Sequence, residues 1–125
     1  MYTRLVMLLL LVIGLFGCGN GDTSGSLSLA APTAVNYTVN AVATYTPASG
    51  SALPGQEIEF TWYTMPTGGV ATQAVHVTGY TDSKGVASSQ YIFPTPPAVA
   101  TYVYVSAKTG NLSNKEGYQS VLVTP

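Results

Sequence analysis

The feature that most constrains the fold is a repeated alternation of apolar and polar residues in short segments of the chain. The clearest case is residues 57–63, where Ile58, Phe60 and Trp62 occupy every second position. Because successive side chains of a β-strand point to opposite faces, this alternation predicts a strand with one buried face and one wet face. Trp62 is therefore expected in the core.

The same pattern recurs along the chain between turn signals. Residues 81–85 (TDSKG) predict a tight turn, because Asp82 suits the first turn position and Gly85 tolerates the positive φ often needed at the last. We expect this turn to close a hairpin. The prolines of residues 94–97 end another strand, since proline cannot donate to a ladder. The predicted strands are residues 36–45, 57–63, 71–78, 87–93, 99–107 and 115–124.

Composition favours strands over helices and limits the size of the fold. Beyond the first residues, Gly, Ser, Thr, Pro, Tyr and Val dominate while strong helix formers are scarce, which is typical of many short strands separated by turns. A chain of 125 residues has room for one domain, and its single cysteine allows no disulfide within the chain. We predict an all-β fold over residues 36–125, an immunoglobulin-like β-sandwich of about seven short antiparallel strands.

The first residues have the layout of a secretory signal peptide. Arg4 supplies a positive charge, and residues 5–16 are apolar apart from Gly14. A transmembrane helix needs about 20 apolar residues, so this shorter run is better explained as a cleavable leader over residues 1–17. The sequence therefore predicts an exported protein.

Leu15-Phe16-Gly17-Cys18 resembles the lipobox of bacterial lipoproteins. The resemblance implies that the signal peptidase recognises Leu15 and Gly17, that a diacylglyceryl group is attached to the Cys18 sulfur, and that Cys18 becomes the mature N-terminus. A lone thiol is reactive in an oxidising compartment, and lipid attachment removes that reactivity. Two or three acyl chains on Cys18 would hold the protein firmly at a membrane, which is its first expected partner.

The residues after Cys18 bear on where the protein sits. Gly19 stands where an aspartate would resemble an inner-membrane retention signal. We therefore expect a lipid-anchored protein of the bacterial cell envelope, in the outer membrane rather than the inner one. Residues 18–35, which include the lipidated cysteine, are rich in Gly, Ser, Thr and Ala. They predict a flexible tether, because this composition buries too little apolar surface to offset the entropy lost on ordering.

Two further segments resemble the bacterial immunoglobulin-like domains of the invasin and intimin type. They are residues 50–60 (GSALPGQEIEF) and 81–87 (TDSKGVA). In that family a Pro-Gly loop leads into a strand that carries Phe, and a Thr-Asp-x-x-Gly-x-Ala turn follows. The resemblance covers about residues 36–124 and implies a rigid adhesion or spacer module rather than a catalyst. It also implies a structural role for Pro54, Gly55, Phe60, Thr81, Asp82, Gly85 and Ala87.

Few residues could carry catalysis or bind a metal. Beyond the leader there is one histidine, His76, and no cysteine other than Cys18. No nucleophile, base and orienting group can be proposed together, so we expect neither an enzyme nor a cofactor. A zinc site lacks its donors, and Asp82 alone is a weak nucleus for calcium. Because 7% of the residues are charged and the formal net charge is −1, nucleic acid is not an expected partner.

Tyrosines give the one hint of a ligand-binding face. Tyr63, Tyr102 and Tyr104 fall on the faces of their strands opposite the aliphatic residues. Exposed rings there could stack on sugars or contact a protein, whereas rings covered by loops would be ordinary strand residues. We expect a non-catalytic structural, adhesion or protein-interaction module that contacts an envelope protein or a surface ligand. The alternative is a carbohydrate-binding module that uses these tyrosines.

Overall fold

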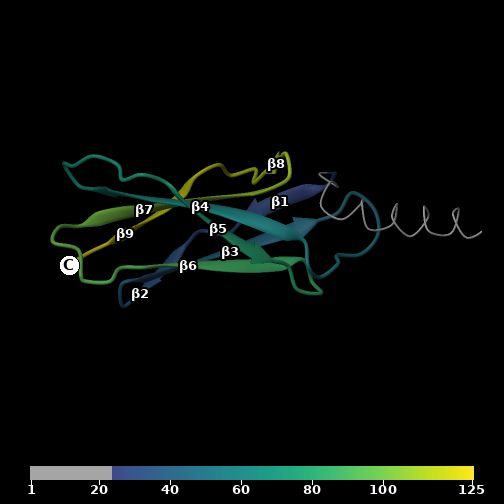
Figure 1. The fold of residues 1–125 in the computed structure, drawn as a ribbon, viewed down its shortest axis with the longest axis horizontal. Coiled ribbons are helices and arrows are strands. Elements are labelled where there is room, and N and C mark those ends of the chain that lie inside the picture. Colours follow the sequence, from purple (N-terminus) through teal and green to yellow (C-terminus); the bar gives the residue numbers. More distant parts are fainter. Residues whose placement is uncertain (1–23) are drawn as a thin grey trace, which may run out of the picture.

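A computed structural model describes residues 24–125, and the predicted signal peptide and Cys18 lie outside the described residues. The described part is all-β and contains nine strands in two antiparallel sheets (Figure 1). None of its segments forms a helix that could cross a bilayer. The strands are β1 (Ser26–Leu29), β2 (Thr33–Val35), β3 (Thr38–Thr46), β4 (Glu57–Pro66), β5 (Val75–Tyr80), β6 (Val86–Ile92), β7 (Thr101–Thr109), β8 (Leu112–Ser113) and β9 (Gln119–Val123).

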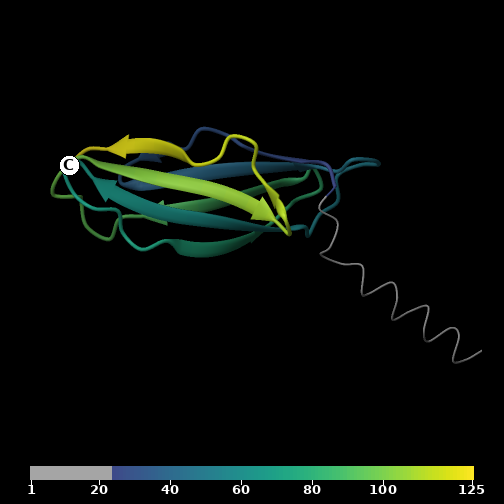
Figure 2. The same ribbon diagram turned by 90° about the horizontal axis from the view of Figure 1, so that it is seen from above.

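Each sheet is built around a long central strand. In the first sheet, β1 and β2 pair with successive halves of one edge of β3, and β6 pairs with the other edge. In the second sheet, β5 and β7 flank β4, and β8 and β9 pair with β7. In the view from above, the second sheet lies in front of the first (Figure 2). The predicted all-β sandwich without a disulfide is therefore confirmed, with nine strands in place of about seven.

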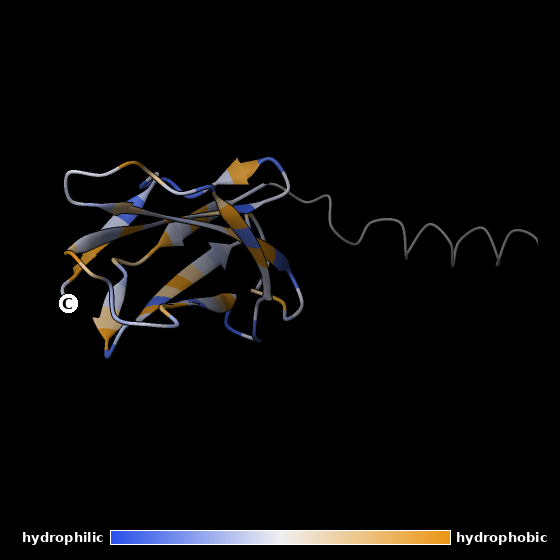
Figure 3. Cartoon of the chain, turned by 60° about the vertical axis from the view of Figure 1, so that its left-hand side comes forward, coloured by the Kyte–Doolittle hydropathy of each residue, from blue (hydrophilic) through white to orange (hydrophobic). Residues whose placement is uncertain are grey.

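The core lies between the sheets and follows the alternation in the sequence. Bands of apolar and polar residues alternate along the strands (Figure 3). Trp62 is buried as predicted, and its indole Nε1 donates to the Ser89 hydroxyl oxygen on β6 at 3.0 Å. This bond satisfies the one polar group of the buried ring. The buried apolar side chains are Leu27, Leu29, Val39, Ala41, Ala43, Tyr45, Ile58, Phe60, Trp62, Ala87, Val103, Val105, Ala107 and Val123.

The turn predicted at residues 81–85 is present. One oxygen of Asp82 accepts hydrogen bonds from the backbone N–H groups of Lys84 at 2.8 Å and Val86 at 3.1 Å. Gly85 has a φ of 78°, and a Cβ there would lie 2.4 Å from the Tyr45 carbonyl oxygen. Glycine is required at this position because any side chain would be strained and would also collide with the backbone of β3.

The prediction that this turn closes a hairpin is wrong. β5 pairs with β4 in the second sheet, whereas β6 pairs with β3 in the first. The turn therefore carries the chain from one sheet to the other. A tight turn between two alternating segments does not distinguish a hairpin from such a crossing, because both use the same local turn chemistry.

The two segments that resemble the immunoglobulin-like family are hydrogen-bonded to each other at Thr81. Its hydroxyl accepts from the Gln56 N–H at 2.9 Å and donates to the Leu53 carbonyl at 2.9 Å. Its backbone carbonyl accepts from Gly55 N at 2.7 Å. Thr81 is buried, so these bonds fix the loop before β4 against the end of β5.

The predicted tether is wrong from residue 26 onward, because ordered strands begin there. β1 pairs with β3, and Leu27 and Leu29 are 1% and 2% exposed in the core. β2 and β3 are joined by the two-residue turn Asn36-Tyr37, whose φ angles of 48° and 67° suit a tight hairpin. The strand predicted to begin at Asn36 therefore begins at Thr38.

The segment after β8 holds β1 in place by hydrogen bonds. The Leu29 N–H donates to Glu116 Oε2 at 3.0 Å, and Gln119 Nε2 donates to the Leu29 carbonyl at 2.6 Å. Lys115 N donates to the Leu27 carbonyl at 3.1 Å. Desolvation acts to raise the pKa of the Glu116 carboxyl, but the hydrogen bonds that it accepts from Leu29 and Asn114 contribute to a net lowering. Glu116 is therefore held in its ionised form, which is the better acceptor.

We predict that Leu27→Ala destabilises the fold by about 2–5 kcal/mol, because it removes a fully buried side chain and leaves a cavity. The measurement is urea unfolding followed by circular dichroism. Leu53→Ala is the matched control, since Leu53 is 73% exposed and its truncation should change the free energy of unfolding by less than about 0.5 kcal/mol. Equal stability of the two variants would mean that residues 26–29 belong to the flexible tether and do not form a buried strand.

Candidate functional site

The outer face of the second sheet carries the tyrosines singled out in the sequence. Tyr63 on β4 lies directly across from Tyr104 on β7, and Tyr102 lies two residues along the same strand. Their neighbours in sequence, Trp62 and Val103, are buried in the core. Because side chains alternate along a strand, the three tyrosines point away from the core, as predicted.

A fourth ring completes a contiguous group, which we call the tyrosine face (Tyr63, Tyr102, Tyr104 and Tyr118). Tyr63 and Tyr104 stack with ring centroids 4.6 Å apart and planes 5° apart. Tyr118 meets Tyr63 nearly edge to face at 5.1 Å and 75°, and Tyr102 lies 6.2 Å from Tyr104. These distances are within the range of favourable aromatic pairs, so each ring orients the next.

The tyrosine face is open to solvent. Tyr118 is 51% exposed and Tyr102 is 37% exposed, while Tyr63 and Tyr104 are half-buried by their neighbours. Leu122 on β9 lies directly across from Tyr102 and is also exposed. Exposed apolar patches often mark interaction sites, so the tyrosine face is the candidate binding surface of the second sheet.

Tyr118 is not singled out by the sequence pattern. The sequence places this residue inside a strand predicted over residues 115–124, but in the structure it lies just before β9 and next to Gly117, which has a φ of 68°. Its place beside Tyr63 depends on how β9 pairs with β7, with Gln119 across from Val105. Strand pairing at this distance in sequence is not visible in local periodicity.

Crowding of the rings changes the ionisation of Tyr63. Desolvation by burial raises the pKa of its phenol, and the nearby phenol groups of Tyr104 and Tyr118 raise it further because neighbouring negative charges repel. The folded state therefore keeps this proton to higher pH than the unfolded chain does. The resulting stabilisation is present below the unfolded pKa and is lost as the pH rises through the folded pKa.

We predict that Tyr63 ionises above the ordinary tyrosine pKa, and that Tyr104→Phe moves its pKa part of the way back because desolvation, the largest cause, remains. The measurement is an alkaline titration followed by NMR of the tyrosine ring carbons, with Tyr63→Phe used to assign the signal. A Tyr63 pKa at or below the ordinary value would contradict the packing described for these rings.

The other half of this outer face is polar. Glu59 Oε1 lies 3.6 Å from Lys108 Nζ and 3.3 Å from His76 Nδ1, and Thr61 Oγ1 lies 3.0 Å from the same ring nitrogen. Lys108 is 53% exposed and Glu59 is 36% exposed, so the ion pair between them contributes little to stability. His76 is exposed, as expected from its position between Val75 and Val77.

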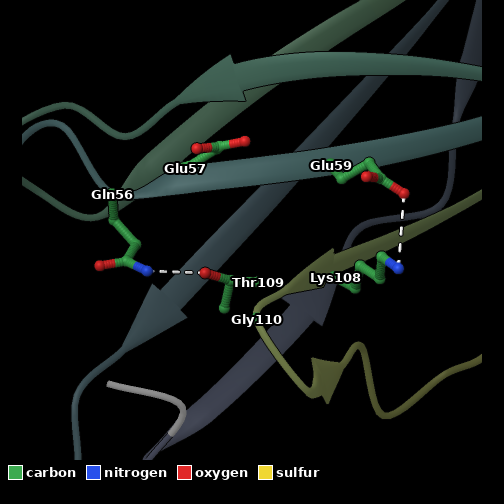
Figure 4. A pocket seen from close by; sticks show the side chains of 6 residues that line it. All are labelled: Gln56, Glu57, Glu59, Lys108, Thr109 and Gly110. Carbon is green, nitrogen blue, oxygen red and sulfur yellow. Dashed lines mark hydrogen bonds and ion pairs between the residues drawn. The ribbon is translucent and has the colours of Figure 1, made fainter. Parts of the chain in front are cut away.

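Two hollows lie along this polar half. One has a volume of about 320 Å³ and lies where Gln56 Nε2 donates to Thr109 Oγ1 at 2.7 Å (Figure 4). The other has a volume of about 200 Å³ and borders the tyrosine face at Tyr118. Lys108 lines both hollows, so they are neighbours on the sheet. Among residues 24–125 there is no group of three carboxylate, thiol or imidazole side chains placed to hold a metal ion.

The remaining predicted site residues fall into two groups. Leu15, Gly17 and Cys18 lie outside the described residues. The residues of the family motif lie in the core or in the loops joined at Thr81, away from the tyrosine face. Asp82 has a lowered pKa because it accepts the N–H groups of Val86 and Lys84, and this fits a turn residue.

Comparison with known proteins adds no assignment. No family model matches the chain, and no curated protein matches it. The resemblance to the bacterial immunoglobulin-like domains therefore stays a prediction.

Proposed function

We propose that the chain is a bacterial cell-envelope lipoprotein, anchored by lipid on Cys18 and placed in the outer membrane rather than the inner one. Its immunoglobulin-like domain is a non-catalytic adhesion or interaction module. The observation that carries the proposal is the exposed tyrosine face on a sandwich that follows a lipobox-like sequence. Tyrosine rings give a large contact area for little loss of side-chain entropy, which suits a binding surface better than a spacer.

The described geometry supports a binding face along the side of the sandwich, between its membrane-proximal end and its C-terminal end. β1 begins at the end of the sandwich opposite the C-terminus (Figures 1 and 2). Residues 19–25 would connect Cys18 to β1, and they reach at most about 25 Å when fully extended. The domain would therefore stand close to the membrane, with its C-terminal end directed away. Tyr102 lies toward that far end, because its strand neighbour Thr101 pairs with Val123 near the C-terminus.

We propose a non-catalytic role for the reason already found in the sequence, which is that no nucleophile, base and orienting group can be proposed together. The one histidine of residues 24–125, His76, is exposed and shares its ring nitrogen between Thr61 and Glu59. A catalytic group of this kind needs an oriented nucleophile and a site that restricts water. An exposed sheet face that lacks such a group suits binding.

We predict that the native protein carries a lipid-sized mass increment at a mature N-terminus at Cys18 and sediments with membranes. Cys18→Ala should lose both properties, because the thiol is the point of attachment. The measurements are intact mass and membrane fractionation in a bacterial host. Equal, unlipidated masses for the two proteins would overturn the anchor and make the domain a freely secreted or signal-anchored module.

We predict that Tyr102→Ala weakens binding to detergent-washed envelope fragments about fivefold, because an exposed anchor ring of this kind contributes about 1 kcal/mol or more. Co-sedimentation is measured with the lipidated protein in the same detergent, so that micelles shield its acyl chains. Tyr80→Ala is the control, since Tyr80 is 64% exposed on β5 of the same sheet but lies outside the tyrosine face. Equal binding by both variants would count against this face as the interaction surface.

A further inference from the structure

The hollow beside Tyr118 combines an aromatic wall with hydroxyl groups. Its volume of about 200 Å³ is lined by Thr61, Ser106 and Ser113 together with Tyr118 and Lys108. A sugar ring presents an apolar face of C–H groups and a polar rim of hydroxyls. Such a ring needs an aromatic side chain to pack against and hydrogen-bonding groups around it. The hollow offers both.

The loop that carries Tyr118 is held rigidly. Asn114 is buried, and its Oδ1 accepts the Ala107 N–H at 3.0 Å while its Nδ2 donates to the Gly117 carbonyl at 2.8 Å. On its other side, Tyr118 is oriented by the edge-to-face contact with Tyr63. A ring fixed in place before a ligand arrives loses little further entropy on binding, so Tyr118 is preorganised.

The surroundings extend this hollow into a row along β7. The tyrosine face lies on one side of it, and the larger hollow at Gln56 and Gly110 lies on the other, beyond Lys108. From Tyr102 to Gly110 the row spans roughly 26 Å, since a strand rises about 3.3 Å per residue. A row of this length suits an extended ligand with repeating units better than a single small molecule.

Charge along the row selects against an acidic ligand. The larger hollow is lined by Glu57 and Glu59, and Lys108 is the one cation in either lining. Lys108 is already 3.6 Å from Glu59, so its charge is partly neutralised. An acidic polymer would meet net repulsion here, whereas a neutral one would find carboxylates, an amide and hydroxyls that can accept and donate hydrogen bonds.

We propose that the outer face of the second sheet binds a linear neutral polysaccharide, with one sugar unit packed on Tyr118 in the smaller hollow. This inference rests on the proposed binding function of the face and names its ligand class. Tyr118 supplies the apolar contact, and Thr61, Ser106 and Ser113 bond to the hydroxyl rim of the sugar.

The test is native affinity electrophoresis of the full-length protein in mild detergent, in gels containing a soluble β-glucan, a xylan or a galactomannan. Alginate serves as the acidic comparison. We expect retardation by at least one neutral polymer and none by alginate. Tyr118→Ala should weaken that binding about tenfold, and Tyr118→Phe should retain most of it because the ring face is kept. Ile92→Ala is the matched control and should bind as the native protein does, since Ile92 is 62% exposed on β6 of the other sheet.

Three results would overturn the inference: no retardation by any of the neutral polymers, stronger retardation by alginate, or equal effects of Tyr118→Ala and Ile92→Ala. Circular dichroism of each variant checks that it is folded. The inference of a sugar ligand can fail while the proposed interaction role stands. Envelope binding that depends on Tyr102 but withstands periodate treatment of the fragments, and is lost after protease treatment, would make the ligand a protein and leave the interaction role intact.

Discussion

The packing of β4 and β7 against the opposite sheet is the constraint on which the rest of the structure depends. Phe60 and Trp62 on β4, with Val103 and Val105 on β7, are almost completely buried. Because side chains alternate strictly, a slip of one residue would turn this whole set toward water. The same packing therefore places Tyr63 and its partners outside, and the tyrosine face is a consequence of the core.

Thr81 holds the adjoining loops in place relative to these strands. Its buried hydroxyl and backbone join the loop before β4 to the turn that carries the chain from β5 to β6. Gly85 permits the close approach of that turn to Tyr45 on β3. The residues of the family-like motifs are thus used to connect the two sheets. These residues lie away from the outer face of the second sheet, where the tyrosine face and the polar side chains are found.

The sequence is sufficient to predict what depends on local pattern and insufficient for what depends on pairing. Alternation places Trp62 in the core and Tyr63 outside, and turn chemistry locates Asp82 and Gly85. β1 escapes prediction because its two buried leucines alternate over only four residues within a Ser- and Ala-rich segment. Tyr118 escapes for another reason: its neighbours come from β4 and from the edge of β7, and only the tertiary fold brings them together.

The early start of the fold alters how an anchored domain would present its face. Glu116 and Gln119 hold β1 in place, so under the proposed anchoring only residues 19–25 would separate the lipid on Cys18 from the first strand. A connection this short would limit how far the proposed anchored domain can tilt and rise, so one end would stay near the bilayer and the row along β7 would run away from it. In the proposed arrangement such a row would meet a polymer of the envelope along its length, and many weak contacts made by one linear chain would add up without any deep pocket.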